Sequence, residues 1–153
     1  PYTTLFRSAG FFVTMYEKDP VIAAMLRDAM ERAAADERMT EILSRMTLEA
    51  QDSIEALRRM KDDPGAQVDV ILLDPMFPER RKSASVKKKF QLLHILERPC
   101  EEEAELVQAA IDAAPGRILI KRPVKGAWLA GVKPSFSLTG KAVRIDCLLP
   151  QQL

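Results

Sequence analysis

Short apolar runs alternate along this chain with longer stretches whose apolar residues recur at helical spacing. The runs are rich in branched and aromatic side chains, as is typical of strands that are buried on both faces. This alternation predicts an α/β fold in which helices cover both faces of a mostly parallel, doubly wound sheet. The sequence predicts strands at residues 11–16, 46–50, 68–73, 117–121 and 143–149, and helices at residues 20–35, 39–44, 54–60, 83–96 and 101–114.

The end of the chain departs from this alternation. Residues 132–140 combine turn residues with a short strand candidate around Phe136, and the last predicted strand follows without an intervening helix. Two strands joined by a short turn form an antiparallel hairpin. We therefore expect a hairpin at one edge of the sheet.

The composition narrows the class of protein. The chain has 153 residues, 47% of them apolar and 29% charged, with a net charge of +1. These values are typical of one soluble globular domain and exclude a protein that is basic throughout. No apolar stretch approaches the roughly 18 residues of a membrane span, and no secretory signal is visible, so we expect a cytoplasmic protein without a membrane partner. Cys100, Cys147 and the single histidine, His94, lack zinc-site spacing, so we expect no metal.

The segment Pro1 to Ser8 stands apart from the rest of the chain. Codon by codon, all eight residues can be read as a frame of a common sequencing-library adapter; an ordinary flexible N-terminus is the alternative. Segments of this kind are excluded from reasoning about the fold. We expect residues 9–153 to be the C-terminal part of a domain that begins further upstream.

Acidic side chains follow the first two predicted strands, at the end of the sheet where open α/β folds bind ligands. If one strand precedes the chain, Glu17 is placed to accept hydrogen bonds from two ribose hydroxyls; alternatively, it is an acid at the start of the next helix. That helix is expected to begin with Asp19 as its N-cap and Pro20 as its first residue. Asp52 could accept a hydrogen bond from an adenine amino group, and it also has the position of a helix N-cap. The two roles of Asp52 can coexist.

The segment Asp74-Pro75-Met76-Phe77-Pro78 follows the clearest strand of the chain. Prolines have a fixed φ, and residues that precede them adopt extended conformations, so this loop is stiff. A stiff loop can hold the Phe77 ring against the face of a planar base while Asp74 accepts a hydrogen bond from an exocyclic amine. The alternative is a turn at the end of the strand, with Phe77 in the core.

Residues 70–89, which read VILLDPMFPERRKSASVKKK, resemble the signature of the RsmJ-type family of bacterial 16S ribosomal RNA guanine-N2 methyltransferases. Tyr16 to Pro20, Arg117 to Pro123 and Arg144 to Asp146 also resemble that family, and the resemblance extends from about Ala9 to the C-terminus. It implies a Rossmann-like sheet, S-adenosylmethionine as the cofactor, and methyl transfer to the exocyclic N2 amine of a guanine in the 16S rRNA of the small ribosomal subunit.

The family's first strand and glycine-rich loop are absent from this sequence. We therefore expect this chain alone to be inactive, to bind the cofactor weakly, and to expose an unpaired sheet edge. Carried over position by position, the resemblance implies that Glu17 and Lys18 hold the cofactor ribose and that Asp52 and Ser53 contact its adenine side. It also implies that Asp74 opens the loop at the methyl-transfer centre, where it contacts both the cofactor and the base.

A basic cluster follows the same loop. Residues 79–89 contain six cations and one acid, Glu79. Cations beside a reactive loop suit the phosphate backbone of RNA, and such binding weakens with salt; a solvated helix face is the alternative. The predicted RNA-binding residues are Arg80, Arg81, Lys82, Lys87, Lys88 and Lys89 in this cluster, and Lys121 and Arg122 across the same edge of the sheet.

Several residues receive no functional role. Arg144 and Asp146 are interpreted as a surface ion pair, Trp128 as a core or hinge aromatic, and the cysteines as buried apolar residues. Two other functions stay open. One is a non-catalytic RNA-binding module, in which the basic cluster is the whole function, and the other is an enzyme that methylates an amino group of DNA.

Overall fold

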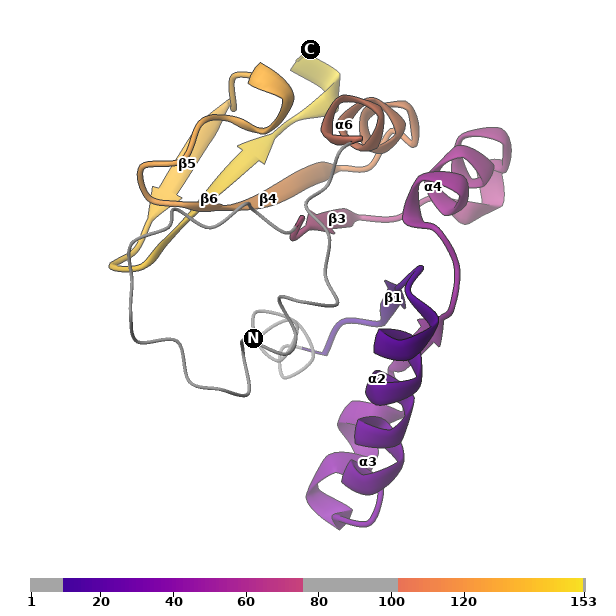
Figure 1. Cartoon of the computed structure of the whole chain (residues 1–153). Helices are drawn as coiled ribbons and strands as arrows, with labels where there is room; N and C mark the ends of the chain where they lie inside the picture. The colour runs from indigo at the N-terminus through magenta and orange to yellow at the C-terminus, as the bar shows by residue number, and fades with distance from the viewer. Residues whose placement is uncertain (1–9, 76–101, 153) are drawn as a thin grey trace. The chain divides into compact units, whose positions relative to one another are not determined.

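The computed structural model of the chain describes residues 10–75 and 102–152. The chain divides into two compact units, Pro1–Ala56 and Leu57–Leu153, and each unit is considered by itself. The division falls within helix α4 (Ser53–Asp62), as Figure 1 allows the reader to follow along the chain. None of the helices within the described ranges is long and apolar enough to cross a membrane.

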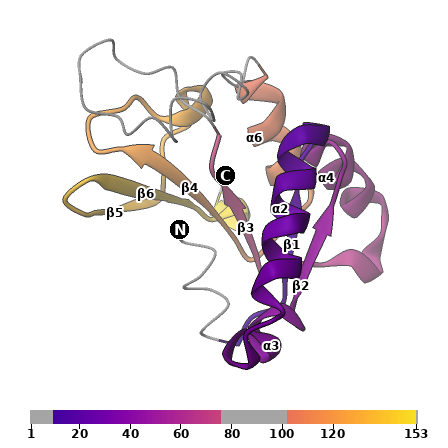
Figure 2. The same cartoon turned by 60° about the horizontal axis from the view of Figure 1, so that its bottom comes forward.

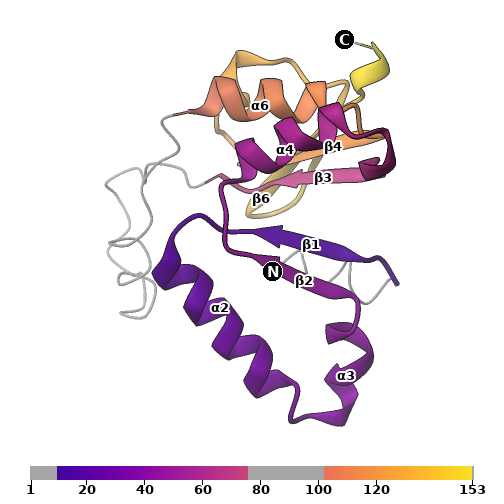
Figure 3. The ribbon, with the colours of Figure 1, turned by 90° about the vertical axis from the view of Figure 1, so that its right-hand side faces the viewer.

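The first unit is built around two parallel strands. Strands β1 (Val13–Tyr16) and β2 (Met46–Glu49) pair in parallel, with Val13 opposite Met46 and Tyr16 opposite Glu49. Helices α2 (Pro20–Ala33) and α3 (Glu37–Leu43) connect them, and α2 lies alongside the strands in Figures 2 and 3. A strand–helix–strand crossover of this kind is the unit from which doubly wound folds are made. The strands and helices predicted for residues 11–50 are thus confirmed, with ends that differ by a few residues.

Helix α2 begins as the sequence predicts. Oδ1 of Asp19 accepts hydrogen bonds from the backbone N–H groups of Val21 (2.8 Å) and Ile22 (3.1 Å), and Pro20 is the first helical residue. The proline has no N–H group, and the first N–H of a helix has no partner within the helix in any case. The end of β1 and the start of α2 are therefore held by local interactions.

The second unit contains a four-stranded sheet whose strand order is β3-β4-β6-β5. Its strands are β3 (Val70–Leu73), β4 (Arg117–Pro123), β5 (Phe136–Thr139) and β6 (Val143–Leu148). β3 and β4 are parallel, whereas β4–β6 and β6–β5 are antiparallel. The predicted hairpin at the sheet edge is confirmed, and β6 is inserted between β4 and β5. Helix α6 (Glu103–Asp112) and three single-turn helices, η1 (Pro64–Ala66), η2 (Leu129–Gly131) and η3 (Pro150–Gln152), complete the described part of this unit.

The α/β fold with parallel strand pairs and an antiparallel C-terminal edge is confirmed, but the described strands form two hydrogen-bonded sheets and not one. One sheet belongs to each unit. The missing first strand stays a prediction from the sequence.

The most buried side chains of β3 and β4 lie on one face of the sheet of the second unit. Ile118 and Ile120 of β4 are buried, and the register places Leu148 and Asp146 of β6 beside them on the same face. Helix α6 contributes buried residues that include Val107 and Ala110. Ion pairs join α6 to the end of α4: Lys61 Nζ lies 2.9 Å from Asp112 Oδ2, and Arg58 pairs with Glu105.

Helix α6 ends where the sequence predicts a stop, but alanine takes the position that usually favours glycine. Ala114 has a φ of 48°, in the left-handed region, and Pro115 follows it. Gly116 then passes close to the chain before β3, because a Cβ atom there would lie 3.0 Å from the Asp69 carbonyl oxygen. The close approach explains why this position needs glycine.

Candidate functional site

Glu17 lies at the carboxyl end of the β1–β2 pair. Its backbone N–H donates to the Glu49 carbonyl (3.1 Å), which extends the strand ladder by one residue. Its Oε1 atom accepts a hydrogen bond from the Asp19 N–H (2.8 Å). Its Oε2 atom has no donor within residues 10–75 and 102–152. Glu17 therefore stabilises the turn into α2 through the Asp19 N–H, and its contact with a ribose stays a prediction.

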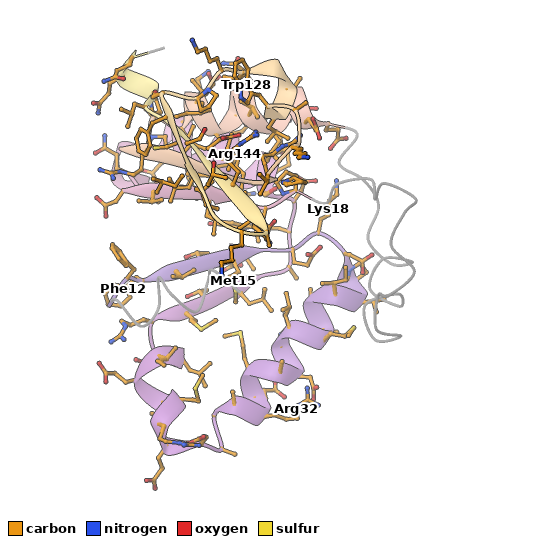
Figure 4. All side chains as sticks on the ribbon, turned by 90° about the vertical axis from the view of Figure 1, so that its left-hand side faces the viewer. Phe12, Met15, Lys18, Arg32, Trp128 and Arg144 are labelled. Carbon is orange, nitrogen blue, oxygen red and sulfur yellow. The ribbon has the colours of Figure 1, made fainter. Side chains whose placement is uncertain are left out.

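Asp52 and Ser53 follow β2 at the same end of the sheet. Asp52 Oδ1 accepts from the Ile54 N–H (2.7 Å), so Asp52 is an N-cap of α4, and Ser53 is its first residue. Asp52 Oδ2 lies 3.4 Å from Lys18 Nζ, and Figure 4 shows Lys18 where β1 leads into α2. The structure thus brings together the four residues that the sequence assigns to the cofactor in this unit. The cap role of Asp52 is confirmed, and its adenine contact stays a prediction.

Asp74 lies at the carboxyl end of the second parallel pair, β3–β4. Leu73 is opposite Ile120, so the next residues along each strand, Asp74 and Lys121, are neighbours. Lys121 Nζ lies 2.6 Å from Asp74 Oδ2, while the Asp74 side chain is half exposed and Pro75 behind it is buried. The lysine holds one carboxylate oxygen of a side chain that is half exposed. A carboxylate fixed in this way can accept a hydrogen bond from an amino group.

Other predicted site residues lie outside the described residues. These are Phe77 and the basic cluster of Arg80, Arg81, Lys82, Lys87, Lys88 and Lys89. Their assignment stays a prediction from the sequence. No group of three or more His, Cys, Asp or Glu side chains that could hold a metal ion was found among residues 10–75 and 102–152.

The predicted phosphate contact of Arg122 does not fit the structure. Arg122 is 6% exposed, its Nε donates to the Ala127 carbonyl (2.8 Å), and its Nη1 lies 3.7 Å from a Glu103 carboxylate oxygen. Burial lowers the pKa of the guanidinium, and the Glu103 carboxylate opposes that change. Residues alternate between the two faces of a strand, so Lys121 and Arg122 cannot both line one surface. Arg122 supports the loop after β4 instead.

The predicted ion pair between Arg144 and Asp146 is confirmed, but it is buried and does not lie at the surface. Asp146 is 2% exposed, and both of its carboxylate oxygens accept hydrogen bonds from Arg144, at 2.7 and 2.8 Å. Ser137 on β5 donates to the same carboxylate (2.5 Å). Burial raises the pKa of Asp146, but the hydrogen bonds from Arg144 and Ser137 outweigh it and hold the pKa below its ordinary value.

These buried charges form a network that sequence reasoning missed. The antiparallel register places Arg122 opposite Arg144 and Ser137 opposite Asp146, so all four side chains share one face of the sheet. One sequence signal was present, because Arg144 and Asp146 are two residues apart in a predicted strand and must point to the same side. The sequence could not show that this side is covered.

Trp128 does not lie in the core, because 42% of it is exposed, and it belongs to the loop between β4 and η2. The alternative that it lies at a hinge stays a prediction. Cys147, by contrast, is buried as predicted, and burial raises the pKa of its thiol.

Similarity to known proteins extends over nearly the whole chain. The family model described as "Putative SAM-dependent methyltransferase" matches residues 3–150, where SAM is S-adenosylmethionine. A protein named ribosomal RNA small subunit methyltransferase J from Chromobacterium violaceum is 45% identical over 138 residues, which are 90% of this chain and 53% of that relative. The protein of the same name from Thioalkalivibrio sulfidiphilus is 40% identical over 139 residues, which are 91% of this chain and 54% of that relative.

The chain therefore spans about half the length of the curated relatives it matches. A solved structure, the crystal structure of a SAM-dependent methyltransferase from Neisseria gonorrhoeae, is also similar. It superposes with a TM-score of 0.76 at 26% identity, and the match covers 99% of this chain and 61% of that one. Because the family model matches nearly the whole sequence and the fold agrees, the chain belongs to the family of SAM-dependent methyltransferases, as its resemblance to the RsmJ-type proteins implies.

Proposed function

We propose that the protein that contains this chain methylates the exocyclic N2 amine of a guanine in 16S rRNA, with S-adenosylmethionine as the methyl donor. The small ribosomal subunit is its partner, and the cytoplasm is its compartment. The observation that carries this proposal is the position of Asp74, which follows a parallel strand and is held by Lys121 at 2.6 Å, in a chain of the methyltransferase family. The relatives named for small-subunit rRNA supply the substrate class.

The residues of the first unit suit the cofactor. A ribose presents two hydroxyl donors, and Glu17 keeps an acceptor oxygen at the carboxyl end of β1. Lys18, Asp52 and Ser53 lie at the same end. There the Asp52 carboxylate accepts a hydrogen bond from the Ile54 N–H and pairs with the Lys18 ammonium. A carboxylate has about four lone-pair positions, so Asp52 can still accept a hydrogen bond from an adenine amino group.

The chemical role of Asp74 follows from the weakness of the nucleophile. The lone pair of a guanine N2 amine is shared with the ring, so the amine reacts only when it is oriented and its developing positive charge is stabilised. A carboxylate that accepts the N2–H hydrogen bond does both. S-adenosylmethionine, when bound, supplies an electrophilic methyl group on sulfur. Asp74 would hold the amine through its N2–H hydrogen bond while the nitrogen takes up the methyl group, and the proton that the nitrogen then gives up would pass to the Asp74 carboxylate or to water. No covalent bond to the protein is required.

The RNA would bind through cations beside this loop. Lys121 lies beside Asp74, but its ammonium is already paired with that carboxylate. Arg122 is buried and donates a hydrogen bond to the Ala127 carbonyl. Most of the phosphate contacts would therefore come from the basic cluster at residues 80–89. The guanine would have to leave its stack to reach Asp74, because an amine in a stacked pair is inaccessible to the enzyme.

Substitution of Asp74 tests the catalytic role. In the full gene product that carries this chain, Asp74→Asn removes the charge that stabilises the reacting amine, and methylation of small subunits should fall by at least about 100-fold. Binding of the RNA should change little. Asp69→Asn is the matched control, because Asp69 is exposed and precedes the same strand at its opposite end. Full turnover by Asp74→Asn would contradict the assigned role.

Calorimetric titration with S-adenosylmethionine tests the cofactor site. Glu17→Gln should weaken binding to the full gene product about tenfold, whereas Glu37→Gln, at an exposed position on α3, should not change it. Absence of any heat with the wild-type protein would instead favour the non-catalytic RNA-binding module. In a competition assay, preferential methylation of duplex DNA over ribosomal subunits would favour the DNA-modifying enzyme.

A further inference from the structure

The only tryptophan of the chain lies on the surface of its second unit. Trp128 is 42% exposed, although the residue that follows it, Leu129, is 1% exposed. Tryptophan has the largest aromatic surface of any side chain, so its exposure to water is costly. An exposed tryptophan next to a buried residue therefore indicates a binding site more strongly than an exposed aliphatic residue does. Figure 4 labels Trp128 together with Arg144, which belongs to the network beneath this loop.

The loop that carries Trp128 is held from below by buried charges. Arg122 Nε donates to the Ala127 carbonyl at 2.8 Å, and Arg144 Nη1 donates to the Val124 carbonyl at 3.1 Å. Arg144 is itself fixed by Asp146. Two arginines are thus used to hold the backbone on the N-terminal side of one exposed ring.

The backbone on the other side of the ring is also constrained. The Trp128 carbonyl accepts from the Gly131 N–H (3.2 Å), and the Leu129 carbonyl accepts from the Val132 N–H (3.0 Å). Between them, Ala130 has a φ of 50°, a left-handed conformation that is strained for an alanine. Strained residues of this kind persist where the surrounding structure determines them, and they are frequent at ligand sites. The backbone on both sides of Trp128 is therefore fixed.

The charges near Trp128 in the sequence indicate which class of ligand the ring would bind. Residues 121–145 contain six cations and no acid, but Lys121 is paired with Asp74, and Arg122 and Arg144 hold the loop. The three other cations are Lys125, Lys133 and Lys141, which are exposed. Lys125 and Lys133 flank Trp128 in the sequence. An exposed aromatic ring among cations is the arrangement with which proteins bind single-stranded nucleic acid, because the ring stacks on a base while the cations attract phosphates.

We propose that Trp128 is a stacking platform for an unpaired base of the RNA substrate, held in place by the loop that Arg122 and Arg144 fix. This inference rests on the proposed function, because that function supplies RNA as the substrate. It adds a binding residue after β4 that is separate from Asp74 and from the basic cluster at residues 80–89. The buried network accordingly acts as a positioning device for the ring.

Trp128 can report on this binding directly, since the chain has no other tryptophan. The experiment titrates the full chain with a single-stranded RNA of about ten nucleotides and follows both tryptophan emission and the anisotropy of a label on the RNA. Stacking should quench the emission, and both signals should give the same Kd. Trp128→Ala should weaken binding roughly 5- to 150-fold, and Trp128→Phe should retain most of the affinity.

Salt dependence separates stacking from charge. Trp128→Ala should leave the slope of log Kd against log salt unchanged, whereas Lys125→Ala should reduce the slope by about 0.7 if it contacts one phosphate. Leu138→Ala is the matched control, because Leu138 is an apolar residue of the same unit with 66% exposure. It should alter neither the affinity nor the slope.

The proposal is overturned if the chain does not bind the RNA, if it binds without quenching of the emission, or if Trp128→Ala binds with wild-type affinity. It is also overturned if the emission is quenched as the protein concentration rises in the absence of RNA. That result would indicate that a second copy of the chain covers Trp128. If Trp128→Ala fails to fold, the wild-type quenching and the Trp128→Phe affinity still decide. Failure of the proposed function is distinguishable, because it would appear as absent cofactor binding in the full gene product while Trp128 still stacks on RNA.

Discussion

Removal of the buried carboxylate at Asp146 should destabilise the second unit strongly. The variant Asp146→Asn keeps the size of the side chain but loses its charge, and it places an NH₂ group against donors from Arg144 or Ser137. Asp146 is 2% exposed and accepts three hydrogen bonds, at 2.7, 2.8 and 2.5 Å. Breaking a buried ion pair by removing one partner costs about 3–5 kcal/mol, because the remaining charge stays buried without compensation.

Urea unfolding followed by circular dichroism measures this loss. With an m-value of about 2 kcal/mol/M, a loss of this size lowers the midpoint by about 2 M. The matched control is Glu105→Gln, which breaks the exposed pair with Arg58 and should cost less than about 1 kcal/mol. The double variant Arg144→Met/Asp146→Leu should recover much of the stability, since apolar residues of similar volume can replace a buried pair. If Asp146→Asn costs no more than Glu105→Gln, the account of the buried network is wrong.

The same carboxylate makes stability depend on pH. The pKa of Asp146 is lower in the folded chain than in the unfolded chain, where it is about 3.9. Its contribution is therefore complete above about pH 4 and is lost as the pH falls through the folded pKa. Wild-type protein should lose stability in this acidic range more steeply than Asp146→Asn. Parallel stability curves for the two proteins between pH 5 and pH 2 would contradict the assignment.

Three further changes are predicted. Ala114→Gly should raise the free energy of unfolding by about 0.5–1 kcal/mol, because Ala114 has a left-handed φ at the end of α6; urea unfolding checks this. Asp52→Ala should cost about 1 kcal/mol through loss of the α4 cap, a loss that Asp52→Ser should largely avoid in the same assay. Lys121→Met should change thermal stability little, because the pair with Asp74 is partly exposed, but methylation by the full gene product should fall; equal activity would show that the lysine does not position Asp74.

Much of the fold could be predicted from the sequence because its signals are local. The N-cap at Asp19 with Pro20 after it, and the apolar run at β3, depend only on neighbouring residues, and the structure confirms both. Strand ends were less predictable. β4 continues to Pro123, two residues beyond the predicted end, because Arg122 and Pro123 pair with residues of β6.

The candidate site divides in the same way. That Glu17, Asp52 and Asp74 follow strands could be predicted, because the polar residue after an apolar run is visible in the sequence. The pairing of Asp74 with Lys121 could not, because it depends on the register between β3 and β4. Nor could Trp128 be placed, since its exposure depends on how the loop after β4 is supported.

By itself, the sequence determined the class of the fold, the positions of its acidic strand ends and the resemblance to a methyltransferase family, because these depend on residue type and spacing along the chain. Only the tertiary structure decided that Arg122 and Arg144 turn inward while Trp128 turns outward. Burial and pairing are set by side chains that antiparallel strands bring together from distant parts of the chain. A charged residue is stable inside only where such partners compensate it.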